Sequence, residues 1–89
     1  MAEGGPWTIV VLPRAATPMK RLPSTERTRI TSAIDRLALG PRAAGAKPLH
    51  GRDEWTLRVG ERRVLFRIDE SKRTIVVTAV GPRGDVYKR

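Results

Sequence analysis

The sequence predicts an α+β domain in which two N-terminal helices pack on one face of a small antiparallel β-sheet. Three observations support this fold class. A helical apolar stripe lies within residues 30–38, an alternating hairpin pattern within residues 55–68, and a β-branched run at residues 74–80. Helices that come early, followed by a run of strands, favour segregated layers over alternating βαβ units. The expected order of elements is β-α-α-β-β-β.

The length of 89 residues fits one small domain with a limited core, spanning residues 1–89 with a flexible N-terminus at 1–6. No apolar run approaches the roughly 20 residues that cross a bilayer, and no signal-peptide pattern is present. We therefore expect no membrane association and a cytoplasmic location. The absence of cysteine excludes disulfides and thiolate metal sites.

The first strand is expected at residues 7–12, a nearly continuous apolar run that ends at Pro13 and indicates burial on both faces. Residues 14–21 are weakly helical. Because Pro18 is tolerated in a first turn but not deep in a helix, we expect a short, irregular helix there.

The second helix is better defined, with Ser24 as a possible N-cap and Glu26 in the first turn, where a carboxylate suits the helix dipole. Gly40-Pro41 ends it. Its apolar stripe consists of Ile30, Ala33, Ile34, Leu37 and Ala38.

After a loop at residues 41–47, residues 48–51 form a short edge strand or a turn. A polar turn is expected at residues 69–73, before the last strand at 74–80. The register of that strand stays open by one residue, a shift that exchanges its faces.

The hairpin at residues 55–68 is the most informative segment, because Gly60-Glu61 fits a two-residue turn in which Gly accepts a positive φ. The turn pairs Val59 with Arg62, Arg58 with Arg63, Leu57 with Val64 and Trp55 with Phe66. Like charges directly opposite each other normally destabilise a sheet. The Arg58–Arg63 pair therefore indicates an anionic ligand.

Alternation along the hairpin separates a helix-covered face from an open, charged face. Arg62 falls on the covered face but close to the turn, where its head can reach water. The covered face carries Trp55, Leu57, Val64, Phe66 and Ile68, and the open face carries Thr56, Arg58, Arg63, Leu65 and Arg67.

The charge balance points to a polyanionic partner, either nucleic acid or an acidic protein, with a merely solvated surface as the alternative. Eighteen Lys and Arg against nine Asp and Glu give a net charge of +9, and the pI is about 11.5.

The open face has no carboxylate pair, metal-ligand cluster or nucleophile–histidine pair, and the single histidine, His50, lies in a loop. Arginine stabilises a phosphorane-like transition state but is a poor base. A reaction at this face would take its nucleophile from the substrate. The ribose 2′-OH of RNA gives the hypothesis of RNA cleavage without metal or cofactor.

At these positions the sequence resembles the RelE/ParE superfamily of toxins from bacterial type II toxin–antitoxin modules, and more closely the RelE branch. The similarity covers nearly the whole chain. It includes Pro48-Leu49-His50-Gly51, the hairpin of residues 55–66, and Val80-Gly81-Pro82-Arg83 followed by Asp85-Val86-Tyr87.

The resemblance implies a RelE-like fold and a ribosome-dependent endoribonuclease that cleaves mRNA in the A site by 2′-OH attack and so inhibits translation. It implies the ribosome and mRNA as partners, together with a cognate antitoxin in a toxin–antitoxin hetero-oligomer.

The resemblance also assigns roles to residues. Arg58 matches a basic residue before the turn, and Arg63 matches the arginine that contacts the scissile phosphate. Arg83 matches the arginine of a Val-Gly-x-Arg motif. Tyr87 matches a C-terminal tyrosine that stacks on the substrate and transfers protons. Supporting RNA contacts are expected from Thr56, Arg62, Arg67, Lys88 and Arg89, and no metal site is expected.

Three departures from the family pattern leave alternatives open. Thr56 stands where well-studied ribonucleases of this family have a first lysine. Pro82 and Gly84 stand where many relatives have His or Lys and a second Arg. The alternatives are a ParE-like toxin that inhibits DNA gyrase without nuclease activity, a catalytically weak antitoxin-binding homologue, and a plain basic binding module.

Overall fold

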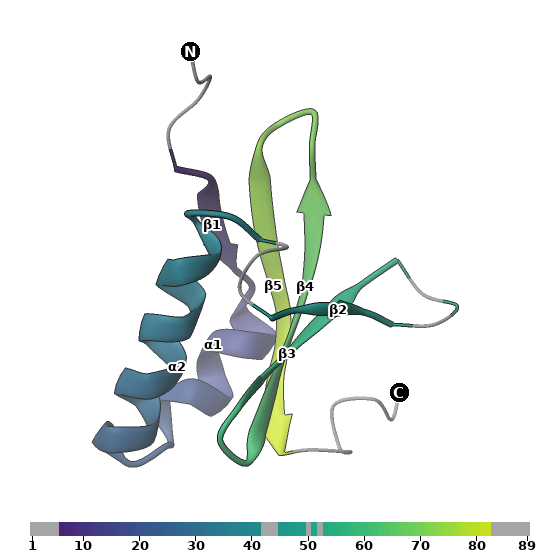
Figure 1. Ribbon diagram of the computed structural model, residues 1–89. Coiled ribbons are helices and arrows are strands. Elements are labelled where there is room, and N and C mark those ends of the chain that lie inside the picture. Colours follow the sequence, from purple (N-terminus) through teal and green to yellow (C-terminus); the bar gives the residue numbers. More distant parts are fainter. Residues whose placement is uncertain (1–5, 42–44, 50, 52, 83–89) are drawn as a thin grey trace.

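The fold consists of two helices packed against a five-stranded sheet (Figure 1). The computed structural model describes residues 6–41, 45–49, 51 and 53–82. The elements are β1 (Thr8–Val11), α1 (Pro13–Lys20), α2 (Ser24–Leu37), β2 (Lys47–Pro48), β3 (Trp55–Val59), β4 (Arg62–Asp69) and β5 (Thr74–Pro82). The α+β class and the order of elements are confirmed. No helix in the described part of the chain is long and apolar enough to cross a membrane.

The sheet is mixed rather than wholly antiparallel, with strand order β1-β5-β4-β3-β2. β1 pairs in parallel with β5, whereas the pairs β2–β3, β3–β4 and β4–β5 are antiparallel. A parallel pair needs a long crossover connection, and most of the chain lies between β1 and β5. The hairpin pattern of the sequence revealed only the antiparallel part.

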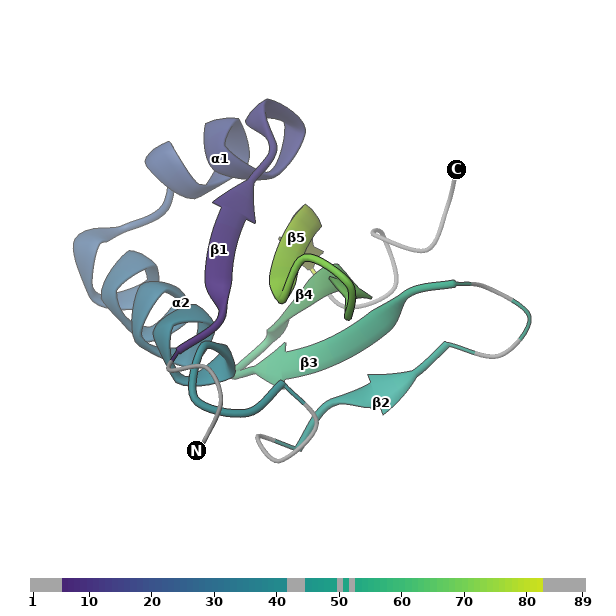
Figure 2. The same cartoon turned by 90° about the horizontal axis from the view of Figure 1, so that it is seen from above.

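β1 is an edge strand with one face toward the helices (Figure 2). Thr8 is exposed and Val10 is 41% exposed, while Ile9 and Val11 pack against the core. The prediction that this strand is buried on both faces was therefore wrong. An apolar run does not distinguish an edge strand from a central one.

The helices follow the predicted ranges but start differently. α1 begins at Pro13 and continues through Pro18 before it stops at Lys20. α2 is preceded by Pro23 at the N-cap position, with no side-chain cap, and Ser24 is its first helical residue. The predicted capping role of Ser24 was wrong, because Pro23 already supplies the extended residue that precedes the first turn.

The core forms where the stripe of α2 meets the covered face of the sheet, as predicted. Phe66 is fully buried at its centre. The buried residues of this cluster are Ala15, Ile30, Ala33, Ile34, Leu37, Leu57, Val64, Phe66, Ile75, Val77 and Val80.

A β-bulge in β5 resolves the register that the sequence left open. Phe66 pairs with Val77, but Leu65 pairs with Ala79, so Thr78 is the extra residue on β5. The apolar side chains of β5 therefore face the core at positions 75, 77 and 80 instead of 75, 77 and 79.

Two side chains from other elements hold the bulge at Thr78, which is 2% exposed. Its hydroxyl donates to Glu54 Oε2 at 2.7 Å and lies 3.3 Å from the Leu65 carbonyl. Arg14 Nε of α1 donates to the Thr78 carbonyl at 3.1 Å. The bulge shifts the far half of β5 by one residue, and this shift brings Gly81 opposite Arg63.

Candidate functional site

The Arg58–Arg63 pair is present as the sequence predicts. β3 and β4 pair in the expected register, with Arg58 opposite Arg63 and Val59 opposite Arg62. Gly60 has a φ of 62° and turns the chain between the two strands. The short turn fixes the register, and the register places both arginines on one face of the sheet.

The two guanidinium groups differ in environment. Arg58 is exposed, and its Nε donates to the Gly60 carbonyl at 3.3 Å. This contact uses one of the five N–H donors of the group. Arg63 is half-buried, and its Nε atom is buried. A charge in the less polar surroundings of Arg63 is screened less by water and acts more strongly on a bound anion.

The face around the pair is less open than predicted. Thr56 is 6% exposed and Leu65 is 2% exposed, although both were expected on the open face. Glu54, just before β3, reaches past β4 to the Thr78 hydroxyl on β5. This contact connects the start of β3 with β5 across β4. The predicted RNA contact by Thr56 thus falls on a buried residue.

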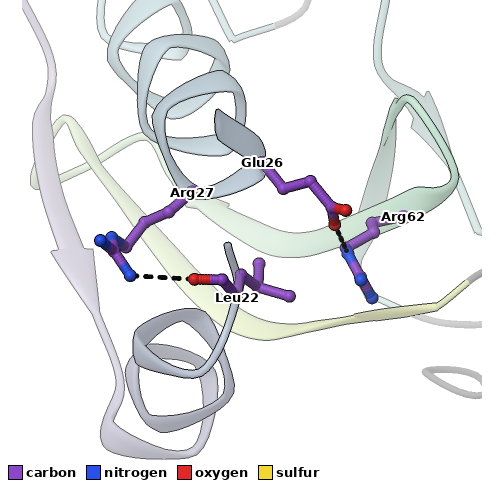
Figure 3. A network of polar contacts seen from close by, with 4 residues as sticks. All are labelled: Leu22, Glu26, Arg27 and Arg62. Carbon is purple, nitrogen blue, oxygen red and sulfur yellow. Dashed lines mark hydrogen bonds and ion pairs between the residues drawn. The ribbon is translucent and has the colours of Figure 1, made fainter. Parts of the chain in front are cut away.

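Arg62 lies on the helix-covered face near the turn, as predicted, and forms an ion pair with α2 (Figure 3). Its Nε is 2.7 Å from Glu26 Oε1, and the side chains are 26% and 44% exposed. In the same region Arg27 Nη1 donates to the Leu22 carbonyl at 3.0 Å and ties α2 to the segment before it. The RNA contact expected of Arg62 remains a prediction.

Arg67 is exposed at the other end of β4, opposite Val76 of β5. It lines a shallow hollow of about 330 Å³ together with Asp53, Asp69 and Glu70. Its surroundings are acidic, unlike those of the Arg58–Arg63 pair. A role in RNA binding stays a prediction here too.

Arg83, Tyr87, Lys88 and Arg89 lie outside the described residues. β5 ends with Gly81 opposite Arg63 and Pro82 opposite Arg62, so its end lies beside the arginine pair. Within the described residues no cluster of His, Cys, Asp and Glu could hold a metal ion. The site that the structure displays is therefore a cationic surface at the turn end of the β3–β4 hairpin.

The described part of the chain has two helices on one face of a small sheet and a cationic hairpin turn, so the protein is a small basic α+β domain. Residues 9–87 match the family described as ParE toxin of type II toxin-antitoxin system, parDE. The chain belongs to this family and is a type II toxin of the RelE/ParE superfamily. A search of curated proteins found no match.

Solved structures agree with this assignment. The toxin–antitoxin complex RelBE2 from Mycobacterium tuberculosis contains a similar chain, with a TM-score of 0.80, 25% identity, and coverage of 96% of this chain and 100% of that one. A mutant of the E. coli toxin RelE in the free state has a TM-score of 0.78, 20% identity, and coverage of 92% and 90%. The archaeal RelE–RelB complex from Pyrococcus horikoshii OT3 contains a similar chain, with a TM-score of 0.75, 19% identity, and coverage of 88% of this chain and 96% of that one. The predicted RelE-like fold is confirmed.

Proposed function

We propose that this toxin is an endoribonuclease that cleaves mRNA on the ribosome and is neutralised by a cognate antitoxin. The observation that carries the proposal is the Arg58–Arg63 pair. A sheet gains nothing from two guanidinium groups in opposed positions unless an anion lies between or above them. The scissile phosphate of RNA is an anion of the right charge and shape for two arginines.

The reaction is a transesterification in which the 2′-oxygen forms a bond to phosphorus and the bond from phosphorus to the 5′-oxygen breaks. The proton of the 2′-OH is lost to a base and the 5′-oxygen gains one, so the products are a 2′,3′-cyclic phosphate and a 5′-OH. The phosphorane carries one more negative charge than the diester. Arg63 would stabilise that added charge from its half-buried position, and Arg58 from the surface side.

Proton transfer is assigned by the resemblance alone. Tyr87 would move protons and Arg83 would assist at the leaving oxygen. Glu54 directly precedes β3, but its Oε2 accepts the Thr78 hydroxyl hydrogen bond at 2.7 Å. We therefore give Glu54 a structural role rather than that of a base.

A toxin that inhibits DNA gyrase without cutting RNA is the second candidate. The match to the ParE family favours it, and so does Thr56. At this position ribonucleases of the RelE branch have a lysine, whereas the side chain here is neutral and 6% exposed. The residues next to the arginine pair on this face, Thr56 and Leu65, thus provide no positive charge for binding a substrate.

The antitoxin partner is proposed from the family and from the matched complexes, which are named as toxin–antitoxin pairs. Co-expression with the product of an adjacent reading frame should yield a stable complex on size-exclusion chromatography. Growth should resume in cells that make both proteins.

The nuclease proposal is tested by mapping cuts in an mRNA by primer extension after adding the purified toxin to programmed ribosomes. We expect cuts within the A-site codon and none on free mRNA. Arg63→Ala should lower the cleavage rate by about 100-fold or more, as expected for one lost transition-state donor. Lys72→Ala, an exposed change in the β4–β5 turn, is the control. Intact mRNA together with trapped gyrase–DNA complexes would establish the second candidate instead.

A further inference from the structure

A groove of about 470 Å³ runs between α2 and the outer side of β3 and has a strongly basic lining. Three of its lining residues are arginines, two carry hydroxyl groups, and none carries a carboxylate. These polar residues are Thr28, Arg29, Ser32, Arg36 and Arg58. The groove is therefore cationic and rich in hydrogen-bond donors.

The helix supplies these groups in a row. Arg29, Ser32 and Arg36 follow one another at i, i+3 and i+7, which places them on one side of α2. All three are exposed. Seven residues of α-helix span about 10 Å, so Arg29 and Arg36 can contact different phosphates of one strand.

Two of the arginines meet at Gly60. Arg58 Nε is 3.3 Å from the Gly60 carbonyl, and Arg29 Nη1 is 3.7 Å from the position that a Cβ of Gly60 would occupy. Among the described residues, neither guanidinium has a carboxylate partner. Both guanidinium groups therefore lie at the same turn as the Arg58–Arg63 pair, where a bound anion would attract each of them.

Arg58 belongs to the groove and also stands opposite Arg63, so the groove is continuous with the proposed phosphate site. β2 pairs with Trp55 and Thr56, and among the described strands none pairs with residues 57–59 on that edge of β3. The neighbouring hollow is lined by Glu26 and Glu61 as well as by Arg29 and Arg62, and its two carboxylates repel phosphate. A polyanion would therefore pass along Arg29 and Arg36.

We infer that this groove binds the phosphate backbone of the RNA strand that flanks the cleavage site, an inference that rests on the proposed function. An acidic protein segment fits less well, because protein interfaces rely on apolar or aromatic anchors in pockets. Of the three apolar lining residues, Ala33 and Leu57 are only 3% and 6% exposed, and Val59 is half-buried. Arginine and hydroxyl groups are the usual contacts to phosphate oxygens.

The test compares a groove variant with a charge-matched control. Arg29→Gln/Arg36→Gln removes two charges from the groove, and Arg21→Gln/Lys72→Gln removes two from exposed turns elsewhere. Binding of a labelled 12-nucleotide single-stranded RNA is followed by fluorescence anisotropy between 50 and 200 mM salt. Two lost phosphate contacts should reduce the slope of log K against log salt by about 1.4. The wild type should therefore lose roughly sevenfold more affinity over this range than the groove variant.

Each outcome decides the inference. Equal slopes for the groove variant and the control overturn it, and so does a groove variant that loses only its affinity for an acidic antitoxin peptide. RNA binding that depends on the groove, with ribosomal mRNA left intact, supports the groove and rejects the nuclease proposal. If the groove variant still cleaves ribosomal mRNA and its slope of log K against log salt equals that of the wild type, the nuclease proposal is supported and the groove is rejected.

Discussion

Replacing Arg58 by Gln should make the protein more stable and less active. The residue stands directly opposite Arg63 and is exposed, so its removal relieves a like-charge contact. Its hydrogen bond to the Gly60 carbonyl, at 3.3 Å, is long and solvent-exposed. Little stabilising energy is therefore lost with the side chain.

The magnitude follows from the cross-strand geometry. The Cβ atoms of cross-strand neighbours lie about 5 Å apart; if the two charges are taken to be separated by the same distance, they repel by about 0.8 kcal/mol in water. At 0.1 M salt, where the Debye length is about 10 Å, screening lowers this to about 0.5 kcal/mol. For a domain of this size that corresponds to a rise in Tm of about 2–4 °C.

Thermal unfolding followed by circular dichroism at 0.1 M and 1 M salt measures this effect. The gain should shrink at 1 M salt, where the Debye length is about 3 Å. Arg67→Gln is the matched control, because Arg67 is exposed on β4 and lies opposite the uncharged Val76. It should show no gain. In the ribosome assay, Arg58→Gln should lower mRNA cleavage by about 100-fold.

A loss of stability in Arg58→Gln, or a gain equal to that of Arg67→Gln, would show that the opposed arginines are not in electrostatic conflict. The reasoning that links the pair to an anion would then fail. If Arg58→Gln gains stability as expected but cleaves mRNA at the wild-type rate, the two arginines do repel each other, and Arg58 is not part of the catalytic site.

Three further predictions concern the scaffold around the site. Thr78→Val removes the buried hydroxyl that donates to Glu54, and the free energy of unfolding measured in urea should fall by about 1–3 kcal/mol. The control Thr74→Val removes an exposed hydrogen bond and should lower the free energy of unfolding by less than about 1 kcal/mol. Glu26→Gln breaks the half-exposed ion pair with Arg62 and should cost at most about 1 kcal/mol, less at high salt. The hydrogen bonds from the Ser71 hydroxyl and the Lys72 N–H lower the pKa of Asp69 below its usual 3.8. The carboxylate therefore stabilises the fold above about pH 4, and this contribution is lost as the pH falls below 3.8. A plot of Tm between pH 2 and 5 should be flatter for Asp69→Asn, and identical plots would contradict the assignment.

The pairing of residues in the hairpin could be predicted because its determinants are local. Gly60 specifies the turn, the turn specifies the register, and alternation then places Arg58 opposite Arg63. The stripe of α2 is local in the same way. These elements carry the core and the arginine pair, so the fold class followed from them.

The features that alternation missed depend on contacts distant in sequence. The bulge at Thr78 needs Glu54 and Arg14, which lie 24 and 64 residues away. Strict alternation would have turned Ala79 rather than Val80 toward the core. No local pattern reports these distant contacts.

The basic groove was missed for a different reason. The apolar stripe of α2 explains its packing, and residues off that stripe, such as Arg29 and Arg36, read as solvated surface. Only the placement of α2 against the β3 edge brings them beside Arg58. The sequence of a polar helix face does not indicate a binding site until the element packed beside it is known.

The distribution of acidic residues argues that the positive turn is maintained for a ligand. Of nine acidic residues in the chain, Asp53, Asp69 and Glu70 line a hollow near Arg67, at the end of the hairpin away from Gly60. Glu26 is already paired with Arg62. Glu26 and Glu61 line the adjoining hollow together with Arg29, but no described carboxylate lines the groove that contains Arg29, Arg36 and Arg58. A surface selected only for stability would bring opposite charges together, whereas a surface that binds phosphate loses affinity with each nearby carboxylate.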